Sequence, residues 1–253
     1  MAEKATLNVV LEVRNKGGHS SMPPRENAIY RLGRAMARLE EFEFPVKLNE
    51  VTREFFVRMS RIETGPAARD MKAIAGTTPD PEAARRLAAS PFYNAQMRNT
   101  CVATRLEGGH ADNALPQAAR VVVNCRLLPG ESPQEALQTL KRVVSDDQVA
   151  IRTRNEAKLS RPSPLSPEVL RSVERTTAAL WPGVPVVPTM STGGTDGRDL
   201  RNAGIPTYGV SGLFEDIDDI RWHGRDERVG AKAFFEAQEF LYKLVKDLAS
   251  NGQ

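Results

Sequence analysis

Strict alternation of apolar and polar residues predicts a half-buried β-strand over residues 6–14. The residues on its apolar face are Leu7, Val9, Leu11 and Val13. The opposite face carries Asn8, Glu12 and Arg14. A domain usually has some slack before its first element, so we expect that further sequence precedes this strand.

Helical spacing replaces the alternation after a turn-rich loop at residues 17–24. The helix is expected from Asn27, with the basic residues Arg31, Arg34 and Arg38 outside. Its apolar positions are Ile29, Leu32, Met36 and Leu39. Residues 45–98 hold short helical pieces, such as 81–89, between glycines and prolines. We interpret this segment as an insertion whose role the sequence does not reveal.

Two further strands, a helix and a short strand complete the first pattern. The strands are expected at 101–107 and 119–128, the helix from Pro133, and the last strand at 149–154. The second strand presents Val121, Val123, Cys125 and Leu127 on one face, and the helix presents Ala136, Leu137, Leu140 and Val144. The order β-α-(insertion)-β-β-α-β is the ferredoxin-like split βαβ pattern, an antiparallel sheet with two helices on one face. We assign it to a first domain, residues 1–155.

A proline-rich segment, residues 156–167, separates this domain from a different pattern. A helix is expected at 167–180, short strands at 184–187 and 207–210 around a glycine-rich loop, and a long terminal helix. The apolar face of that last helix is predicted to hold Phe234, Ala237, Leu241, Leu244 and Leu248. Residues 156–253 therefore indicate an α/β unit, but one with too few strands to cover its own sheet edges.

Composition excludes several classes of protein. The 35 basic and 32 acidic residues are mixed along the chain, which argues against a nucleic-acid partner. No apolar run is long enough to span a membrane, and no secretory leader is recognisable, so we expect a soluble protein of cytoplasm or periplasm. Cys101 and Cys125 are too few for a disulfide framework, and we expect small buried residues on strands.

Only three histidines are present, and each has a plain structural interpretation beside a functional one. His19, in a Gly-Gly-His-Ser-Ser loop, is either a surface residue or a donor to a developing oxyanion. His223, at the end of an acidic loop formed by residues 215–219, is either structural or a metal ligand. His110 is interpreted as a residue of a tight turn between two strands.

The loop at residues 191–198 is the most unusual segment. Its glycines allow backbone N–H groups to approach an anion, and Arg198 adds a fork for a carboxylate. It matches neither a Walker motif nor a dinucleotide fingerprint, and the alternative is a bare strand-to-helix turn.

Five segments in sequence order resemble the aminoacylase, glutamate carboxypeptidase and succinyl-diaminopimelate desuccinylase family. They are Gly-Gly-His-Ser-Ser-x-Pro from Gly17, Asn-Ala-Leu-Pro from Asn113, Cys-Arg-Leu-Leu-Pro-Gly from Cys125, Gly-Gly-Thr-Asp-Gly-Arg from Gly193 and His-Gly-Arg-Asp-Glu-Arg from His223. The last form is most similar to the carboxypeptidase S-like branch. The resemblance implies a lid, or dimerisation, domain followed by the closing part of an α/β zinc-peptidase catalytic domain.

The resemblance also implies roles. His223 matches a zinc ligand, and His19 matches a lid histidine that stabilises the oxyanion in the partner subunit's active site. The positions that match substrate-binding groups are Asn113, Arg126, Gly194, Thr195 and Arg198. The implied reaction is hydrolysis of a peptide or N-acyl-amino-acid amide beside a free carboxylate, in a homodimer with two zinc ions.

The sequence departs from the family pattern in one respect. In the family, a His-x-Asp and a Glu-Glu pair that supply most of the metal ligands precede the lid, and neither precedes the lid pattern in this sequence. The chain is therefore expected to be inactive alone, as a part of a metallohydrolase. The alternative is a stand-alone, non-catalytic dimerisation module, which would have no use for His19, Arg126, Arg198 and His223.

Overall fold

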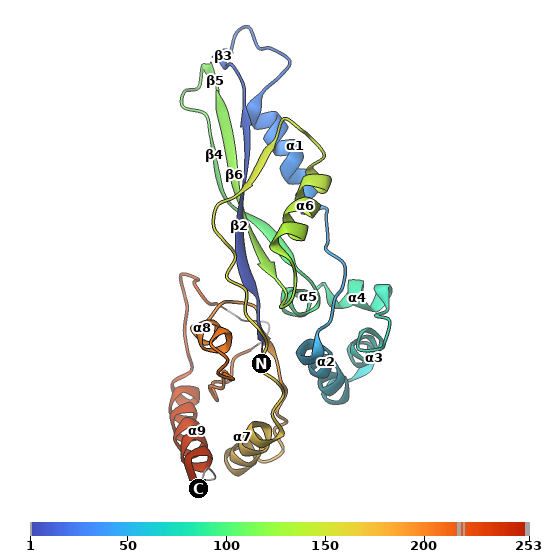
Figure 1. The fold of residues 1–253 in the computed structure, drawn as a ribbon, viewed down its shortest axis with the longest axis vertical. Helices are drawn as coiled ribbons and strands as arrows, with labels where there is room; N and C mark the ends of the chain where they lie inside the picture. Colours follow the sequence, from blue (N-terminus) through green and yellow to red (C-terminus); the bar gives the residue numbers. More distant parts are fainter. Residues whose placement is uncertain (1, 217–218, 220, 251–253) are drawn as a thin grey trace.

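The computed structural model describes residues 2–216, 219 and 221–250 and shows an elongated molecule with a sheet at one end (Figure 1). The sheet contains β2 (Ala5–Arg14), β4 (Thr100–Gly108), β6 (Ala118–Leu127) and β7 (Ala150–Thr153). Its strands are antiparallel in the order β4-β6-β2-β7. The helices α1 (Ala28–Glu40) and α6 (Pro133–Val144) cover one face (Figure 1). The predicted split βαβ arrangement is confirmed.

The alternating residues of β2 and β6 form the core of this sheet as predicted. The apolar residues predicted to share a face on each strand, Leu7 to Val13 on β2 and Val121 to Leu127 on β6, are at most 3% exposed. Helix α1 begins at the predicted Asn27, whose side chain caps the backbone of Ile29 and Tyr30. The predicted helix face was wrong in one position, because Ile29 is exposed and the buried face starts at Ala28.

Glu12 was expected on the exposed face of its strand, but its side chain is buried. It lies on the face of the sheet without helices, yet it is 3% exposed because arginine side chains cover it. Arg14, Arg120 and Arg152 all pair with its carboxylate. Burial acts to raise the pKa of Glu12, but hydrogen bonds from Arg120 and Arg14 outweigh it, and the pKa lies below its usual value.

The insertion is a compact helical module. It consists of α2 (Glu50–Ile62), α3 (Gly65–Ile74), α4 (Pro81–Leu87) and α5 (Pro91–Met97). Its own core is built from Phe55, Phe56, Met71, Ile74, Ala83, Ala84, Leu87 and Met97. The buried amide of Gln96 donates to the carbonyl of Met190 at 2.9 Å, so the module is tied to the second part of the chain.

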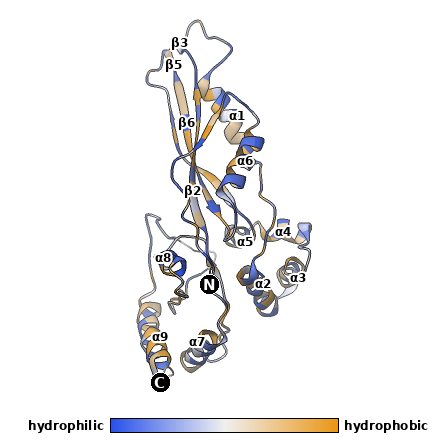
Figure 2. Cartoon of the chain, in the orientation of Figure 1, coloured by the Kyte–Doolittle hydropathy of each residue, from blue (hydrophilic) through white to orange (hydrophobic). Residues whose placement is uncertain are grey.

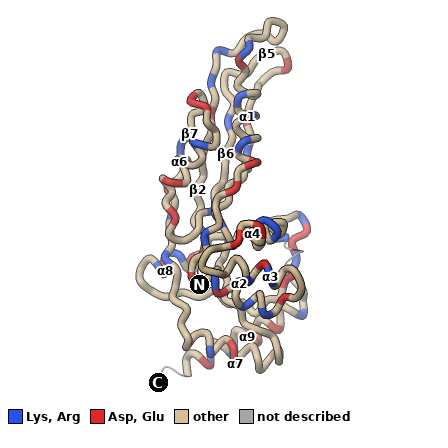
Figure 3. Tube along the Cα trace, turned by 90° about the vertical axis from the view of Figure 1, so that its right-hand side faces the viewer, with Lys and Arg blue, Asp and Glu red and all other residues tan. Residues whose placement is uncertain are grey.

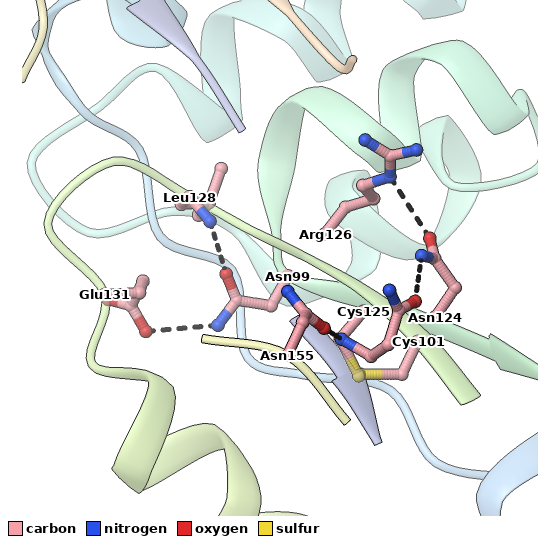
Figure 4. The surroundings of a disulfide bond; sticks show 9 residues. Asn99, Cys101, Asn124, Cys125, Arg126, Leu128, Glu131 and Asn155 are labelled. Atoms are coloured by element: carbon pink, nitrogen blue, oxygen red, sulfur yellow. Dashed lines mark hydrogen bonds between the residues drawn. A yellow bond between two sulfur atoms is a disulfide. The ribbon is translucent and has the colours of Figure 1, made fainter. Parts of the chain in front are cut away.

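The cysteines lie on strands as expected, Cys125 buried and Cys101 partly buried, but the bond between them was not predicted. Cys101 on β4 and Cys125 on β6 are register partners and form a disulfide (Figure 4). Beside it, Asn99 accepts from the backbone of Leu128 and donates to Glu131, which fixes the same end of the sheet (Figure 4). The pairing escaped sequence analysis because it depends on strand register, which two isolated cysteines do not reveal.

The second part of the chain contains α7 (Pro167–Leu180), β8 (Met190–Ser191), α8 (Gly197–Asn202) and α9 (Ala231–Ser250). β8 pairs in parallel with β1 (Ala2–Glu3), so the first residues of the chain join this unit. The strands expected at 184–187 and 207–210 are not assigned; those described segments are irregular. Apolar positions run along α9 (Figure 2), but the buried ones are Ala237, Phe240 and Leu244, and Phe234, Leu241 and Leu248 are exposed.

Candidate functional site

His19 and Asn113 lie together at the distal tip of the sheet. The expected loop at residues 17–24 contains a two-residue strand, β3 (Gly18–His19), which pairs with β5 (Ala114–Leu115). The backbone N–H of Ser20 donates to the carbonyl of Asn113 at 3.0 Å. Two segments far apart in sequence thus present exposed polar side chains at one tip (Figure 1).

Gly17 makes this pairing possible. Its φ of +71° lies in the left-handed region, and an added Cβ would meet the Leu115 carbonyl oxygen at 3.0 Å. A larger residue would therefore push β3 away from β5. The position of His19 is set by the turn that precedes it.

The hydrogen bonds around His19 define its tautomer. The backbone N–H of Ser21 donates to Nδ1 at 3.2 Å, and the Ser21 hydroxyl lies 2.8 Å from the same atom. Because Nδ1 accepts, the proton of the neutral ring resides on Nε2. The exposed Nε2–H can then donate a hydrogen bond to a group of another molecule.

Arg126, Gly194 and Arg198 gather at the other end of the sheet. The Arg126 guanidinium donates to the Thr6 hydroxyl at 2.7 Å and to Asn124 at 3.1 Å. Thr6 in turn borders a cleft of about 240 Å³ that Gly194 and Arg198 also line. We call this opening the carboxylate cleft; its other lining residues are Glu3, Lys4, Ala5, Asn155, Glu156 and Lys158.

Arg198 and Thr195 are already held by acidic residues of this chain. Arg198 forms a two-pronged contact with Asp199, each distance 3.1 Å, and this hydrogen bonding lowers the pKa of Asp199. Thr195 donates its backbone N–H and its hydroxyl to Glu3, at 3.1 and 2.5 Å. Glu3 also pairs with the buried Arg201 at 2.8 Å. These contacts orient the loop, and they leave Gly194 and the Arg198 guanidinium at the cleft.

Glu3, Lys4 and Thr6 were not identified from the sequence. Lys4 is 2% exposed, and its ammonium donates to the carbonyl of Arg98 at 2.6 Å. Burial, followed by the nearby Arg126 charge, lowers the pKa of Lys4 to about 7. The available signal was two adjacent charged residues at the start of an apolar strand, which by itself resembles a solvated chain end.

His223 lies on an exposed loop with a φ of +63°. Its backbone N–H donates to Glu227 at 3.3 Å, and Arg221 pairs with Asp219 and Asp226. Part of the acidic loop predicted before it, Ile217 and Asp218, lies outside the described residues. Within the described part of the chain, no three histidine, cysteine or acidic side chains are grouped as a metal site. A single imidazole does not fit a complete zinc site, which needs three or four protein ligands.

The two groups of candidate residues are separated by the length of the sheet (Figure 1). β2 runs from the carboxylate cleft toward the tip through 10 residues, and a strand of that length spans roughly 30 Å. Basic and acidic residues alternate over this length without forming one block (Figure 3). One chain therefore cannot bring His19 and Asn113 to its own Arg126, Gly194 and Arg198.

Comparison with known proteins adds independent information. Residues 1–152 match the M20 family model described as a peptidase dimerisation domain. The chain is 31% identical over 251 residues to a probable carboxypeptidase S-like 2 of Dictyostelium discoideum, covering 98% of this chain and 47% of that protein. It is 27% identical over 263 residues to the human N-fatty-acyl-amino acid synthase/hydrolase PM20D1, covering 98% of this chain and 50% of that protein.

A solved structure shares the fold. The M20 family metallo-carboxypeptidase Sso-CP2 of Sulfolobus solfataricus superposes with a TM-score of 0.63 at 17% identity, covering 97% of this chain and 59% of that chain. The chain spans about half the length of the curated relatives above. Over the described residues, no helix combines the length and apolarity needed to cross a membrane.

Proposed function

The chain belongs to the M20 peptidase family, and from that membership we propose that it provides the lid and the closing part of the catalytic unit of a metallohydrolase. The reaction is hydrolysis of an amide bond beside a free carboxylate, in a peptide or an N-acyl amino acid. Residues 1–155 act as the lid, with the insertion at about 45–98, and residues 156–253 belong to the catalytic unit.

The separation of the two residue groups carries this proposal. The carboxylate cleft and the tip of the same chain lie at opposite ends of the sheet. A second copy related by a two-fold axis supplies the missing tip to each cleft. The edge strand β4 offers unpaired backbone groups for such a pairing, with Val102 and Leu106 more than 60% exposed along it.

Each residue then has a physical task. Arg126, the amino group of Arg198 that Asp199 does not engage, and the backbone at Gly194 bind the substrate carboxylate, for which guanidinium N–H donors are well suited. The partner's Asn113 adds a polar contact. The partner's His19 donates its Nε2–H to the oxygen that gains charge as the amide carbonyl is attacked.

The expected cofactor is a pair of zinc ions, which when bound would polarise the amide carbonyl and supply a hydroxide. His223 offers one imidazole to them. The described residues do not complete such a site. The remaining ligands are proposed to belong to parts of the whole enzyme outside this chain, and the chain alone is proposed to be inactive.

Replacing His19 in the whole enzyme tests this function. His19→Ala should lower turnover by about 10²–10³-fold, the usual effect of removing one oxyanion donor. The melting temperature should not change, because the side chain is exposed and leaves no cavity. His110→Ala, at the same tip, is the matched control and should retain wild-type turnover.

Equal turnover in the two variants would contradict the catalytic role of His19. That result would favour the alternative, a non-catalytic dimerisation module. The measurement is steady-state hydrolysis of an N-acyl amino acid, with circular dichroism melting curves for both variants.

A further inference from the structure

We propose that helix α5 of the insertion forms a specificity wall of the active site, and that the cavity beside it receives the apolar acyl group of the substrate. This inference rests on the proposed function, because it takes the substrate carboxylate to lie in the carboxylate cleft. It gives the helical insertion a role in selecting acyl length.

A cavity of about 970 Å³ separates α5 from the ends of β1 and β8. Pro91, Phe92 and Ala95 line it from α5, Met190 from β8 and Trp222 from the loop before His223. We call it the acyl cavity. Its volume lies in the range of pockets that bury drug-sized ligands, which is far more than an acetyl group needs.

The acyl cavity adjoins the carboxylate cleft. Glu3 lines both openings, and Thr195, which is bonded to Glu3, borders the acyl cavity next to Gly194 of the cleft. One molecule with a carboxylate at one end and an apolar chain at the other would fill both the carboxylate cleft and the acyl cavity. Its amide bond then lies near the contact between Glu3 and Thr195.

The linings of the two openings differ. Three basic residues, Lys4, Lys158 and Arg198, line the carboxylate cleft together with Glu3 and Glu156. In the acyl cavity, α5 contributes proline, phenylalanine and alanine, and the charged residues on the opposite side, Glu3 and Arg201, are paired with each other. An apolar chain gains free energy when it leaves water for such a wall, and a carboxylate does not. The orientation of an N-acyl amino acid across the two openings follows.

The wall formed by α5 is held in place. Gln96, fully buried, donates to the Met190 carbonyl, and Arg58 of α2 donates to the carbonyl of Val186 at 2.9 Å. The insertion has its own apolar core behind α5. A wall fixed to β8 in this way sets a definite size limit, whereas a mobile flap would adapt to its ligand.

The test measures ligand binding to the chain itself through tryptophan fluorescence, in a Trp181→Phe background that leaves Trp222 of the cavity lining as the emitting residue. The ligands are N-dodecanoylglycine, kept below its critical micelle concentration, and N-acetylglycine. Ala95→Phe fills the acyl cavity, and Ala89→Phe is a second filling variant at an exposed lining position. Ala73→Phe, on the solvent side of α3, is the matched control.

The wild-type chain and Ala73→Phe should prefer the dodecanoyl ligand by at least about tenfold, since each methylene adds to the discrimination of an apolar pocket. Both filling variants should lose that preference and keep the weaker binding of N-acetylglycine. Failure of the wild-type chain to bind N-dodecanoylglycine, or unchanged preference in both filling variants, would overturn the inference.

Arg198→Ala separates this inference from the proposed function. It should weaken both ligands. If the dodecanoyl ligand responds to the filling variants but neither ligand responds to Arg198→Ala, the acyl cavity stands and the assigned carboxylate cleft is wrong.

Discussion

Lys4 and Glu3 are charged residues almost completely buried where β1 continues into β2. Glu3 is compensated by Arg201 and Thr195, whereas the Lys4 ammonium donates to a carbonyl oxygen and has a second cation, Arg126, close by. A buried ammonium in this setting costs stability whenever it carries its proton. Lys4 lies at the border of the carboxylate cleft, where the proposed function places a substrate anion that its positive charge would attract.

The stability of the chain should therefore depend on pH through Lys4. Its pKa is about 7 in the folded chain and near 10.5 when unfolded, so the unfolded state binds more protons between these values. Stability then rises with pH across that window, and the penalty is complete below about pH 7. Lys4→Met should remove up to about 2 kcal/mol of this rise between neutral pH and pH 9.

Urea unfolding at several pH values measures this effect. Lys16→Met, at an exposed position beyond the opposite end of β2, is the control and should keep the wild-type slope. If the free energy of unfolding changes with pH identically in the wild-type chain and Lys4→Met, the pKa of Lys4 is not lowered in the folded chain.

At the scale of secondary-structure elements, the spacing of hydrophobic residues determined which buried faces could be predicted from the sequence. The faces of β2, β6 and α6 follow from alternation and helical spacing, because each packs one face on a single core. Glu12 broke the pattern because three arginines from three strands cover it, and only strand order brings them together. The weak strands expected at 184–187 and 207–210 failed because a short apolar run does not specify a pairing partner.

The candidate site was predictable only in pieces. Gly194 and Arg198 could be singled out from a glycine-rich loop, and His19 from another. Their separation, the pairing of Thr195 with Glu3 and the wall formed by α5 depend on contacts between distant segments. No periodicity in the sequence carries that information.

The disulfide between β4 and β6 should stabilise the lid. It closes a segment of 24 residues, which restricts the unfolded chain more than the folded sheet. Replacing both cysteines by alanine should lower the free energy of unfolding by about 2–4 kcal/mol. A reductant should lower the stability of the wild-type chain by a similar amount.

Guanidinium unfolding with and without reductant checks this expectation. The double alanine variant is its own control, because a reductant should leave its midpoint unchanged. Equal midpoints for oxidised and reduced wild-type chain would show that the bond contributes nothing to stability.

At the scale of the whole molecule, the proposed function requires two copies. The tip with His19 and Asn113 lies at one end of the sheet. The cleft lined by Gly194 and Arg198 lies at the other end, with Arg126 bonded to its lining residue Thr6. An exposed edge strand, β4, lies between them and is available for pairing with a second lid. We propose that each active site combines the cleft of one subunit with the tip of its partner.

Subunit mixing in the whole enzyme tests that claim most directly. His19→Ala and His223→Ala dimers, each inactive alone, are combined under conditions in which subunit exchange is confirmed by mass spectrometry. A heterodimer holds one site in which both residues are wild type, so random mixing should restore about a quarter of wild-type turnover. Leu106→Lys in both parents, which charges the β4 edge, should abolish the recovery. If exchange is complete and no activity returns, the shared site between subunits is contradicted.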